Sequence, residues 1–147
     1  MDFIKGNINE ARKEIDKSSK QGKKVIVTAG DSDYNRKILE NKKVSVLLFV
    51  DFSGKDKLKQ RDSGLDHVLC RLAKVNNITI GFDLGFLNEK SDVTMSKKIA
   101  RLSQNIRLCS KYKNKVEVFN YEKNDLVKLK AFLLSLGMNN KMIKQAF

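Results

Sequence analysis

The sequence predicts an α/β fold in which a mostly parallel sheet alternates with helices. Two observations lead to this class: short apolar runs recur along the 147 residues, and the segments between them space their apolar residues at helical intervals. Parallel strands need long crossover connections, and helices supply them. Because no linker or low-complexity tract divides the chain, we expect residues 1–147 to form a single α/β domain.

Four strands are expected, and each is a run of apolar and β-branched residues between polar or glycine-containing segments. In chain order they cover residues 24–29, 44–50, 78–82 and 116–120. The second run has Ser45 as its one interruption, which predicts a strand buried on both faces of the sheet. Phe3 and Ile4 form a short apolar opening before the first strand.

The expected helices connect and flank these strands. They cover residues 7–21, a segment from Asp31 or Asp33 to about Asn41, and residues 65–76, 93–112, 125–136 and 141–147, with loops at 51–64 and 83–92. Asp31 or Asp33 caps the second helix and Asn124 caps the fifth, because short polar side chains accept bonds from first-turn N–H groups. Gly22 and Gly137 follow their helices as left-handed stops.

Several classes of protein are excluded by simple features. The longest apolar run, residues 44–50, is far shorter than the roughly 20 residues that cross a bilayer, so we expect no membrane partner. No secretory signal pattern opens the chain, which predicts a cytoplasmic protein. Cys70 and Cys109 lie far apart and are expected to be free thiols rather than zinc ligands. One histidine and no glycine-rich phosphate loop leave no pattern for nucleophilic or P-loop chemistry.

The formal net charge of +13 is the first indication of function. A charge excess of this size destabilises a compact chain through self-repulsion, which a bound polyanion relieves. Nucleic acid is therefore the expected partner, and a lysine-rich composition without functional meaning is the alternative.

The helix at residues 65–76 carries the first candidate binding surface. Its expected apolar stripe is Leu65, Val68, Leu69, Leu72 and Ala73, with Cys70 on the opposite side. The candidate phosphate donors on that opposite side follow on consecutive turns and are His67, Arg71 and Lys74. Ser63 and Asp66 have the spacing of a capping box, and Arg61 precedes them. The alternative is a well-capped surface helix whose histidine faces water.

The long helix at residues 93–112 shows the same division. Its expected buried stripe is Met95, Ile99, Leu102, Ile106 and Cys109, and the basic residues opposite are Lys97, Arg101, Arg107 and Lys111. Residues 96–115 hold seven basic residues and no acidic one, whereas exposed helix faces normally mix both signs. A face of one sign favours binding to several phosphates, with a solvated lysine-rich face as the alternative.

Carboxylates that follow the predicted strands suggest a different function. Asp31 and Asp33 come after one strand and Asp51 ends the next, at the edge where open α/β sheets bind ligands. Three such groups could hold Mg²⁺, and they resemble the acidic pocket of phosphoacceptor receiver domains. The alternative function is therefore a phosphoacceptor or metal-dependent domain centred on Asp51.

Residues 60–84 contain a long ordered pattern: a basic-Asp-small-Gly loop, an apolar-x-His-Val-Leu helix, two asparagines and an apolar strand that ends Gly-Phe-x-Leu. This pattern resembles the signature of archaeal ribonuclease P protein component 3, the family of the thirty-kilodalton ribonuclease P subunit. The strand–helix–strand pattern upstream is also similar, as are the basic helix and the strand downstream. The resemblance therefore covers most of the chain.

The resemblance implies a protein subunit of an RNA-based endoribonuclease that removes 5′ leaders from precursor tRNA, in which the RNA makes the cut. The polypeptide is then expected to have no catalytic residue and no cofactor, with Mg²⁺ on the RNA. Implied partners are the ribonuclease P RNA, protein component 2 and, through the holoenzyme, precursor tRNA. The matched positions imply RNA or partner contacts for Arg61, His67 and Arg71, and loop-shaping roles for Asp62 and Gly64.

The family has a TIM-like barrel, from which this sequence departs in two ways. A closed barrel needs at least about 200 residues, and the family's N-terminal strand–helix units have no counterpart here, which predicts an incomplete barrel. Its open sheet edges would pair with a partner chain or with a second copy in a homo-oligomer. Gly85 and Phe86 stand where the family often has a basic residue, so one basic contact is missing. A basic module that binds RNA outside this enzyme is a third possibility.

Overall fold

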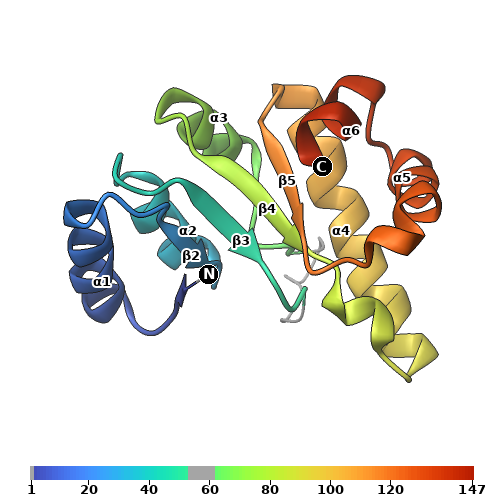
Figure 1. Ribbon diagram of the computed structural model, residues 1–147, viewed down its shortest axis with the longest axis horizontal. Helices are drawn as coiled ribbons and strands as arrows, with labels where there is room; N and C mark the ends of the chain where they lie inside the picture. Colours follow the sequence, from blue (N-terminus) through green and yellow to red (C-terminus); the bar gives the residue numbers. More distant parts are fainter. Residues whose placement is uncertain (1, 53–61) are drawn as a thin grey trace.

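The computed structural model describes residues 2–52 and 62–147, which form a five-stranded parallel sheet with surrounding helices (Figure 1). The strands are β1 (Phe3–Ile4), β2 (Ile26–Thr28), β3 (Val46–Phe49), β4 (Thr79–Asp83) and β5 (Val116–Phe119). Each strand pairs in parallel with the next strand along the chain, so the order across the sheet is β1, β2, β3, β4, β5. The predicted α/β class with a parallel sheet is confirmed.

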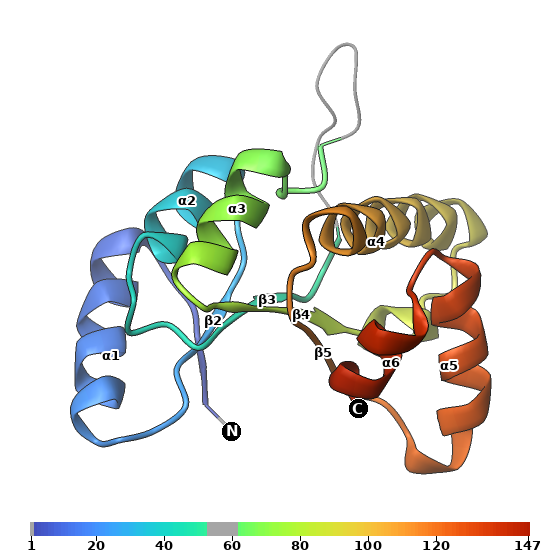
Figure 2. The same ribbon diagram turned by 90° about the horizontal axis from the view of Figure 1, so that it is seen from above.

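Six α-helices and two short 3₁₀ helices complete the described residues. They are α1 (Ile8–Lys20), α2 (Ser32–Leu39), α3 (His67–Val75), η1 (Gly85–Asn88), α4 (Asp92–Tyr112), η2 (Lys123–Asp125), α5 (Leu126–Ser135) and α6 (Asn140–Ala146). Seen from above, α1, α2, α3 and α4 follow one another around one side of the sheet, and α5 and α6 lie beyond β5 (Figure 2). In the described part of the chain, every helix is too short or too polar to span a bilayer.

The strand order distinguishes this sheet from a doubly wound one, whose order reverses at a switch point. Strand–helix steps that continue in one direction are the pattern of (βα) barrels, which close after eight strands. The described residues provide five strands, with β1 and β5 at the two edges. The architecture is an open, barrel-like α/β sheet, as the family resemblance implies.

The sheet is strongly curled, because side chains from its two edge strands meet on the inner face. Phe3 on β1 and Phe119 on β5 pack edge to face, with ring centroids 6.1 Å apart. In a flat sheet these strands would lie four spacings, about 19 Å, apart. Lys24 and Glu117 form an ion pair of 2.8 Å near the same gap. The apolar side chains that fill this inner face are Phe3, Ile26, Val46, Leu48, Val50 and Phe119.

Gly81 in β4 lies against the middle of this inner face. A Cβ atom at this position would lie 2.9 Å from the Val46 side chain and 3.0 Å from the Leu48 and Phe119 side chains. A glycine within a strand commonly marks such a close approach of neighbouring groups. The packing of the inner face therefore explains the glycine of the Gly-Phe-x-Leu pattern.

Local chemistry sets most element boundaries as predicted, with three exceptions. One is the expected loop at residues 83–92, which contains η1. β3 is buried at all four of its positions, and Asp31 accepts a bond of 2.8 Å from the Tyr34 N–H as the N-cap of α2. The expected count of four strands is wrong, because pairing with β2 makes the short opening a fifth strand. The expected cap at Asn124 is also wrong: this residue lies within η2, and Asp125 precedes α5 without a capping bond.

Candidate nucleic-acid interface

The exposed side of α3 and the end of α4 bring three basic side chains around one aromatic ring. The Arg71 guanidinium carbon and the Lys111 ammonium nitrogen each lie 5.5 Å from the centroid of the Tyr112 ring. The His67 ring centroid is 6.5 Å from the Tyr112 centroid, with the rings tilted by 34°. Tyr112 is half-buried, and the three basic residues are exposed. We refer to these four residues as the Tyr112 cluster.

The Tyr112 cluster combines groups that proteins use to bind a nucleic-acid strand. Arginine and lysine neutralise phosphates, while an aromatic ring or a guanidinium plane stacks on an unpaired base. The sequence predicts His67 and Arg71 on one helix and Lys111 on another, and the structure brings the three together. Tyr112 is not among the predicted residues. Its position beside Lys111, at the end of a basic helix, is the signal that identifies it.

The start of α3 is set by Asp66, whose carboxylate accepts a bond of 2.9 Å from the Leu69 N–H. The predicted capping box is wrong, because Ser63 is buried and its hydroxyl donates to the Leu65 carbonyl at 3.4 Å. The cap at Asp66 makes His67 the first residue of α3, and Arg71 follows about one turn later on the same face.

Two buried contacts hold α3 against the end of α4. Cys70 and Cys109 are free thiols, as predicted. Both are fully buried, and they hydrogen-bond to each other. This bond, together with burial, raises the pKa of the Cys109 thiol well above its usual value. Asn114, just after α4, donates from its side chain to the Cys70 carbonyl at 2.7 Å. The geometry of the Tyr112 cluster therefore depends on buried groups behind it.

The buried stripe of α3 differs from the predicted one. Val68 is 48% exposed, although the sequence pattern places it inside, and Cys70 is fully buried, although the pattern places it outside. The physical reason is α4, which packs against the Cys70 side of α3. The exposed positions of His67, Arg71 and Lys74 are not affected by this shift.

Lys74 and Lys97 lie at very different distances from the Tyr112 cluster. Lys74 is exposed in the last turn of α3, about one turn beyond Arg71. Lys97 is exposed near the start of α4, about 21 Å along the helix axis from Lys111 at 1.5 Å per residue. The structure therefore places Lys74 beside the cluster and separates Lys97 from it.

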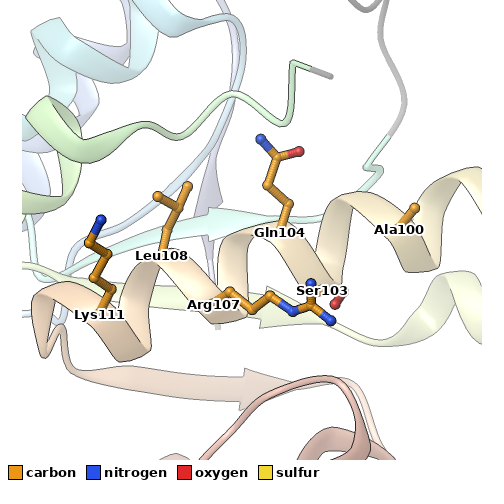
Figure 3. Close-up of a pocket in the computed structure, with 6 residues that line it drawn as sticks. All are labelled: Ala100, Ser103, Gln104, Arg107, Leu108 and Lys111. Atoms are coloured by element: carbon orange, nitrogen blue, oxygen red, sulfur yellow. The ribbon is translucent and has the colours of Figure 1, made fainter. Parts of the chain in front are cut away.

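Arg107 and Lys111 line a groove on the surface of α4 (Figure 3). The groove has a volume of about 540 Å³, and its other lining residues are Ala100, Ser103, Gln104 and Leu108. Figure 3 shows the Arg107 side chain lying along the helix towards Ser103. The stem of Arg107 passes the turn after α5, where a Cβ atom on Gly137 would lie 3.1 Å from the Arg107 Cγ. The groove extends the cationic surface along α4.

Arg101 does not belong to this cationic surface. It is 6% exposed, and its Nη1 donates to the Phe52 carbonyl at 3.1 Å. Asn105, one turn further, is fully buried and donates to the Ser63 carbonyl at 3.5 Å. The prediction of an exposed Arg101 is wrong, because this side of α4 packs against segments after β3 whose buried carbonyl groups need donors.

The loop before α3 is held by Asn35 of α2, which the sequence pattern does not indicate. Its side-chain nitrogen donates to the carbonyls of Gly64 at 2.9 Å and Gly30 at 3.1 Å, and its Oδ1 accepts the Gly30 N–H at 2.8 Å. Asp62 accepts the Gly64 N–H at 3.0 Å, and Gly64 has φ +79°, which favours glycine. The bond between Asp62 and Gly64 and the bond from Asn35 to Gly64 are the contacts that a loop-shaping role for Asp62 and Gly64 requires. Arg61 lies outside the described residues.

The carboxylates of the alternative metal site have other roles. Asp31 caps α2, Asp33 is exposed in the first turn of that helix, and Asp51 pairs with Lys98 at 3.0 Å. Asp31, Asp51 and Asp62 line a common cavity of about 350 Å³. Within residues 2–52 and 62–147, no three His, Cys, Asp or Glu side chains are placed to hold a metal ion. These residues therefore give the metal-dependent alternative no support.

The fold and the site together define an incomplete (βα) barrel with a cationic surface on its outer helices. No protein-family model matches the sequence. The chain is similar to ribonuclease P protein component 3 of Methanococcus vannielii, with 29% identity over 145 residues that cover 99% of this chain and 60% of that protein. Proteins of the same name from two strains of Methanococcus maripaludis are 30% and 31% identical over 125 residues, or 85% of this chain and 51% of each protein. The chain thus spans between about half and three-fifths of the length of these curated relatives.

A solved structure shows the same fold. A chain in the cryo-EM structure of archaeal ribonuclease P with mature tRNA matches with a TM-score of 0.73 and 22% identity, covering 97% of this chain and 61% of that chain. The resemblance to ribonuclease P protein component 3 that residues 60–84 indicate is therefore confirmed.

Proposed function

We propose that this chain is a protein subunit of ribonuclease P, which binds the catalytic RNA and supports the removal of 5′ leaders from precursor tRNA. The observation that carries the proposal is the Tyr112 cluster, in a chain similar to ribonuclease P protein component 3. The net charge of +13 agrees with a polyanionic partner.

The contribution of the protein is electrostatic. A compact RNA brings phosphates close together, and cationic side chains offset their repulsion and so stabilise the folded RNA. Arg71 and Lys111 neutralise phosphates, Tyr112 stacks on an unpaired base, and Lys74 and Arg107 extend the contact on either side. The polypeptide breaks no bond itself, and the Mg²⁺ that cleavage requires is bound by the RNA.

We place the chain beside protein component 2 in the holoenzyme, where it would also meet precursor tRNA. The sheet supports assembly through its edges, because an edge strand has backbone groups that can pair with another chain. β1 pairs with β2 alone among the described residues, whereas α6 packs against β5. The β1 edge is therefore the proposed place for a partner strand or a second copy.

Reconstitution tests this function. The chain is added to archaeal ribonuclease P RNA and protein component 2 at limiting Mg²⁺, and precursor tRNA cleavage is followed over time. The wild-type chain should raise the cleavage rate, and Arg71→Gln/Lys111→Gln should remove most of this gain. Lys13→Gln/Lys128→Gln, which removes the same charge from exposed positions of α1 and α5, should retain it.

Two results would contradict the proposal. An unchanged cleavage rate with the wild-type chain, despite tight RNA binding, would indicate an RNA-binding module outside this enzyme. An equal loss of stimulation in the control variant would mean that net charge, rather than the Tyr112 cluster, is responsible.

A further inference from the structure

A second cationic groove lies where β4 and β5 begin. These two strands begin in the upper part of Figure 1. It has a volume of about 380 Å³, and the charged residues that line it are Lys24, Lys42, Lys43, Lys115 and Glu117. Four positive charges thus face a single negative charge. None of the basic residues that are predicted to bind RNA lines this groove.

The carboxylates nearby leave part of this positive charge without a partner. Glu117 pairs with Lys24 at 2.8 Å. Asp16, which lies outside the groove, pairs with Lys43 at 2.8 Å, and this contact lowers the pKa of Asp16. Each of these two lysines therefore has its own counter-charge in the folded chain.

Lys42 and Lys115 are exposed and form no ion pair with any residue that the structure describes. The Lys115 ammonium group donates to the Asn77 side-chain oxygen at 3.1 Å, and this bond holds it at the groove. Asn77 can then offer its side-chain N–H groups to a ligand. Asn76 fixes the wall of the groove, because its side chain donates to the Leu39 carbonyl at 2.6 Å. Two ammonium groups and one amide donor therefore line the same groove.

The groove adjoins the Tyr112 cluster, because both helices that form the cluster end there. Arg71 lies five residues before Asn76, and Tyr112 lies three residues before Lys115. Five helical residues span about 7.5 Å, and Lys74 is exposed between them. A nucleic-acid strand that rises about 3.4 Å per nucleotide covers that distance in roughly two nucleotides.

We propose that this groove binds phosphate groups of the RNA strand that contacts the Tyr112 cluster, with Lys42 and Lys115 as phosphate ligands and Asn77 as an amide donor. The inference rests on the proposed function for the identity of the RNA, whereas the phosphate chemistry follows from the groove itself. The RNA path then runs over the outer helices to the amino ends of the strands. It stays away from the carboxyl ends, where barrel enzymes have their active sites.

The experiment measures the affinity of the full chain for archaeal ribonuclease P RNA at several KCl concentrations. Lys42→Gln/Lys115→Gln removes two phosphate contacts, so the slope of log affinity against log salt should become shallower by about 1.4–1.8. Lys13→Gln/Lys128→Gln removes the same charge elsewhere and should keep the wild-type slope. Lys42→Arg/Lys115→Arg retains both cations and should also keep it. Thermal unfolding of each variant verifies that the chain is folded.

The outcomes separate this inference from the proposed function. An unchanged slope in folded Lys42→Gln/Lys115→Gln overturns the inference, even where the wild-type chain stimulates precursor tRNA cleavage. A shallower slope specific to this variant supports the groove, even where the wild-type chain gives no stimulation and the proposed function fails. An equally shallow slope in Lys13→Gln/Lys128→Gln overturns the inference, because net charge would then explain the binding.

Discussion

Arg101 and Arg107 lie six residues apart on α4, and loss of their charges should affect two different properties. Loss of Arg101 should lower the stability of the chain, and loss of Arg107 should change the salt dependence of RNA binding. Arg101→Met keeps most of the side-chain stem and removes the donor to the Phe52 carbonyl. A buried acceptor that loses its donor costs about 1–3 kcal/mol of stability. Each kcal/mol lowers Tm by roughly 2–4 °C in a domain of about this size, so Tm should fall by about 2–12 °C. Since Arg101 is buried, the salt dependence of RNA binding should not change.

Arg107→Met is the matched change on the exposed side of the same helix. Its Tm should stay close to that of the wild-type chain, and the salt slope should become shallower by about 0.7–0.9 because one phosphate contact is lost. Circular dichroism melting gives Tm, and fluorescence anisotropy with labelled ribonuclease P RNA at several KCl concentrations gives the slope. A shallower slope with an unchanged Tm for Arg101→Met would refute the reasoning from burial.

Three further changes test the packing behind the surface. Gly81→Val crowds three inner-face side chains, and overpacking of this kind costs about 1–3 kcal/mol, so the urea midpoint should fall; an unchanged midpoint would contradict the close packing. Asn114→Leu removes the donor to the Cys70 carbonyl and should weaken RNA binding at constant net charge, which fluorescence anisotropy would measure. Full RNA affinity in this variant would show that the bond is not needed to position the Tyr112 cluster. The raised pKa of Cys109 keeps this thiol neutral in the folded chain at a pH where the thiol of the unfolded chain ionises. The neutral buried thiol therefore contributes its full stability below the usual thiol pKa, and this contribution is lost as the pH rises above that value. Urea midpoints between pH 7 and about pH 10 should therefore fall more steeply than those of Cys109→Ala, and parallel curves would exclude the effect.

The sequence predicts the elements whose cause lies close by in the chain. The four longer strands follow from apolar runs, and the cap at Asp31 follows from the residues that come after it. β1 could not be predicted in this way, because two residues form a strand only when a neighbouring strand pairs with them. The buried side of α3 could not be predicted for the same reason. It is determined by packing against α4, which buries Cys70.

Buried polar residues are the part of the site that the sequence does not show. Asn35, Arg101 and Asn114 resemble ordinary surface positions in the sequence, yet each donates to a carbonyl group from a distant segment. Whether such a residue is exposed depends on which loop packs over it. Asn35 gives a weak signal, since it lies three residues before Ile38 and so shares the apolar side of α2.

The contact between Phe3 and Phe119 links the number of strands in the sheet to the packing of side chains on its inner face. A ring of more strands has a larger diameter, so a strand that adds to the free side of β1 increases the radius of curvature. The two rings must then separate, and the space between them has to be filled by side chains that the added segment brings. Enlargement of this sheet is thus a repacking event, and the solvent accessibility of Phe119 would report when it takes place.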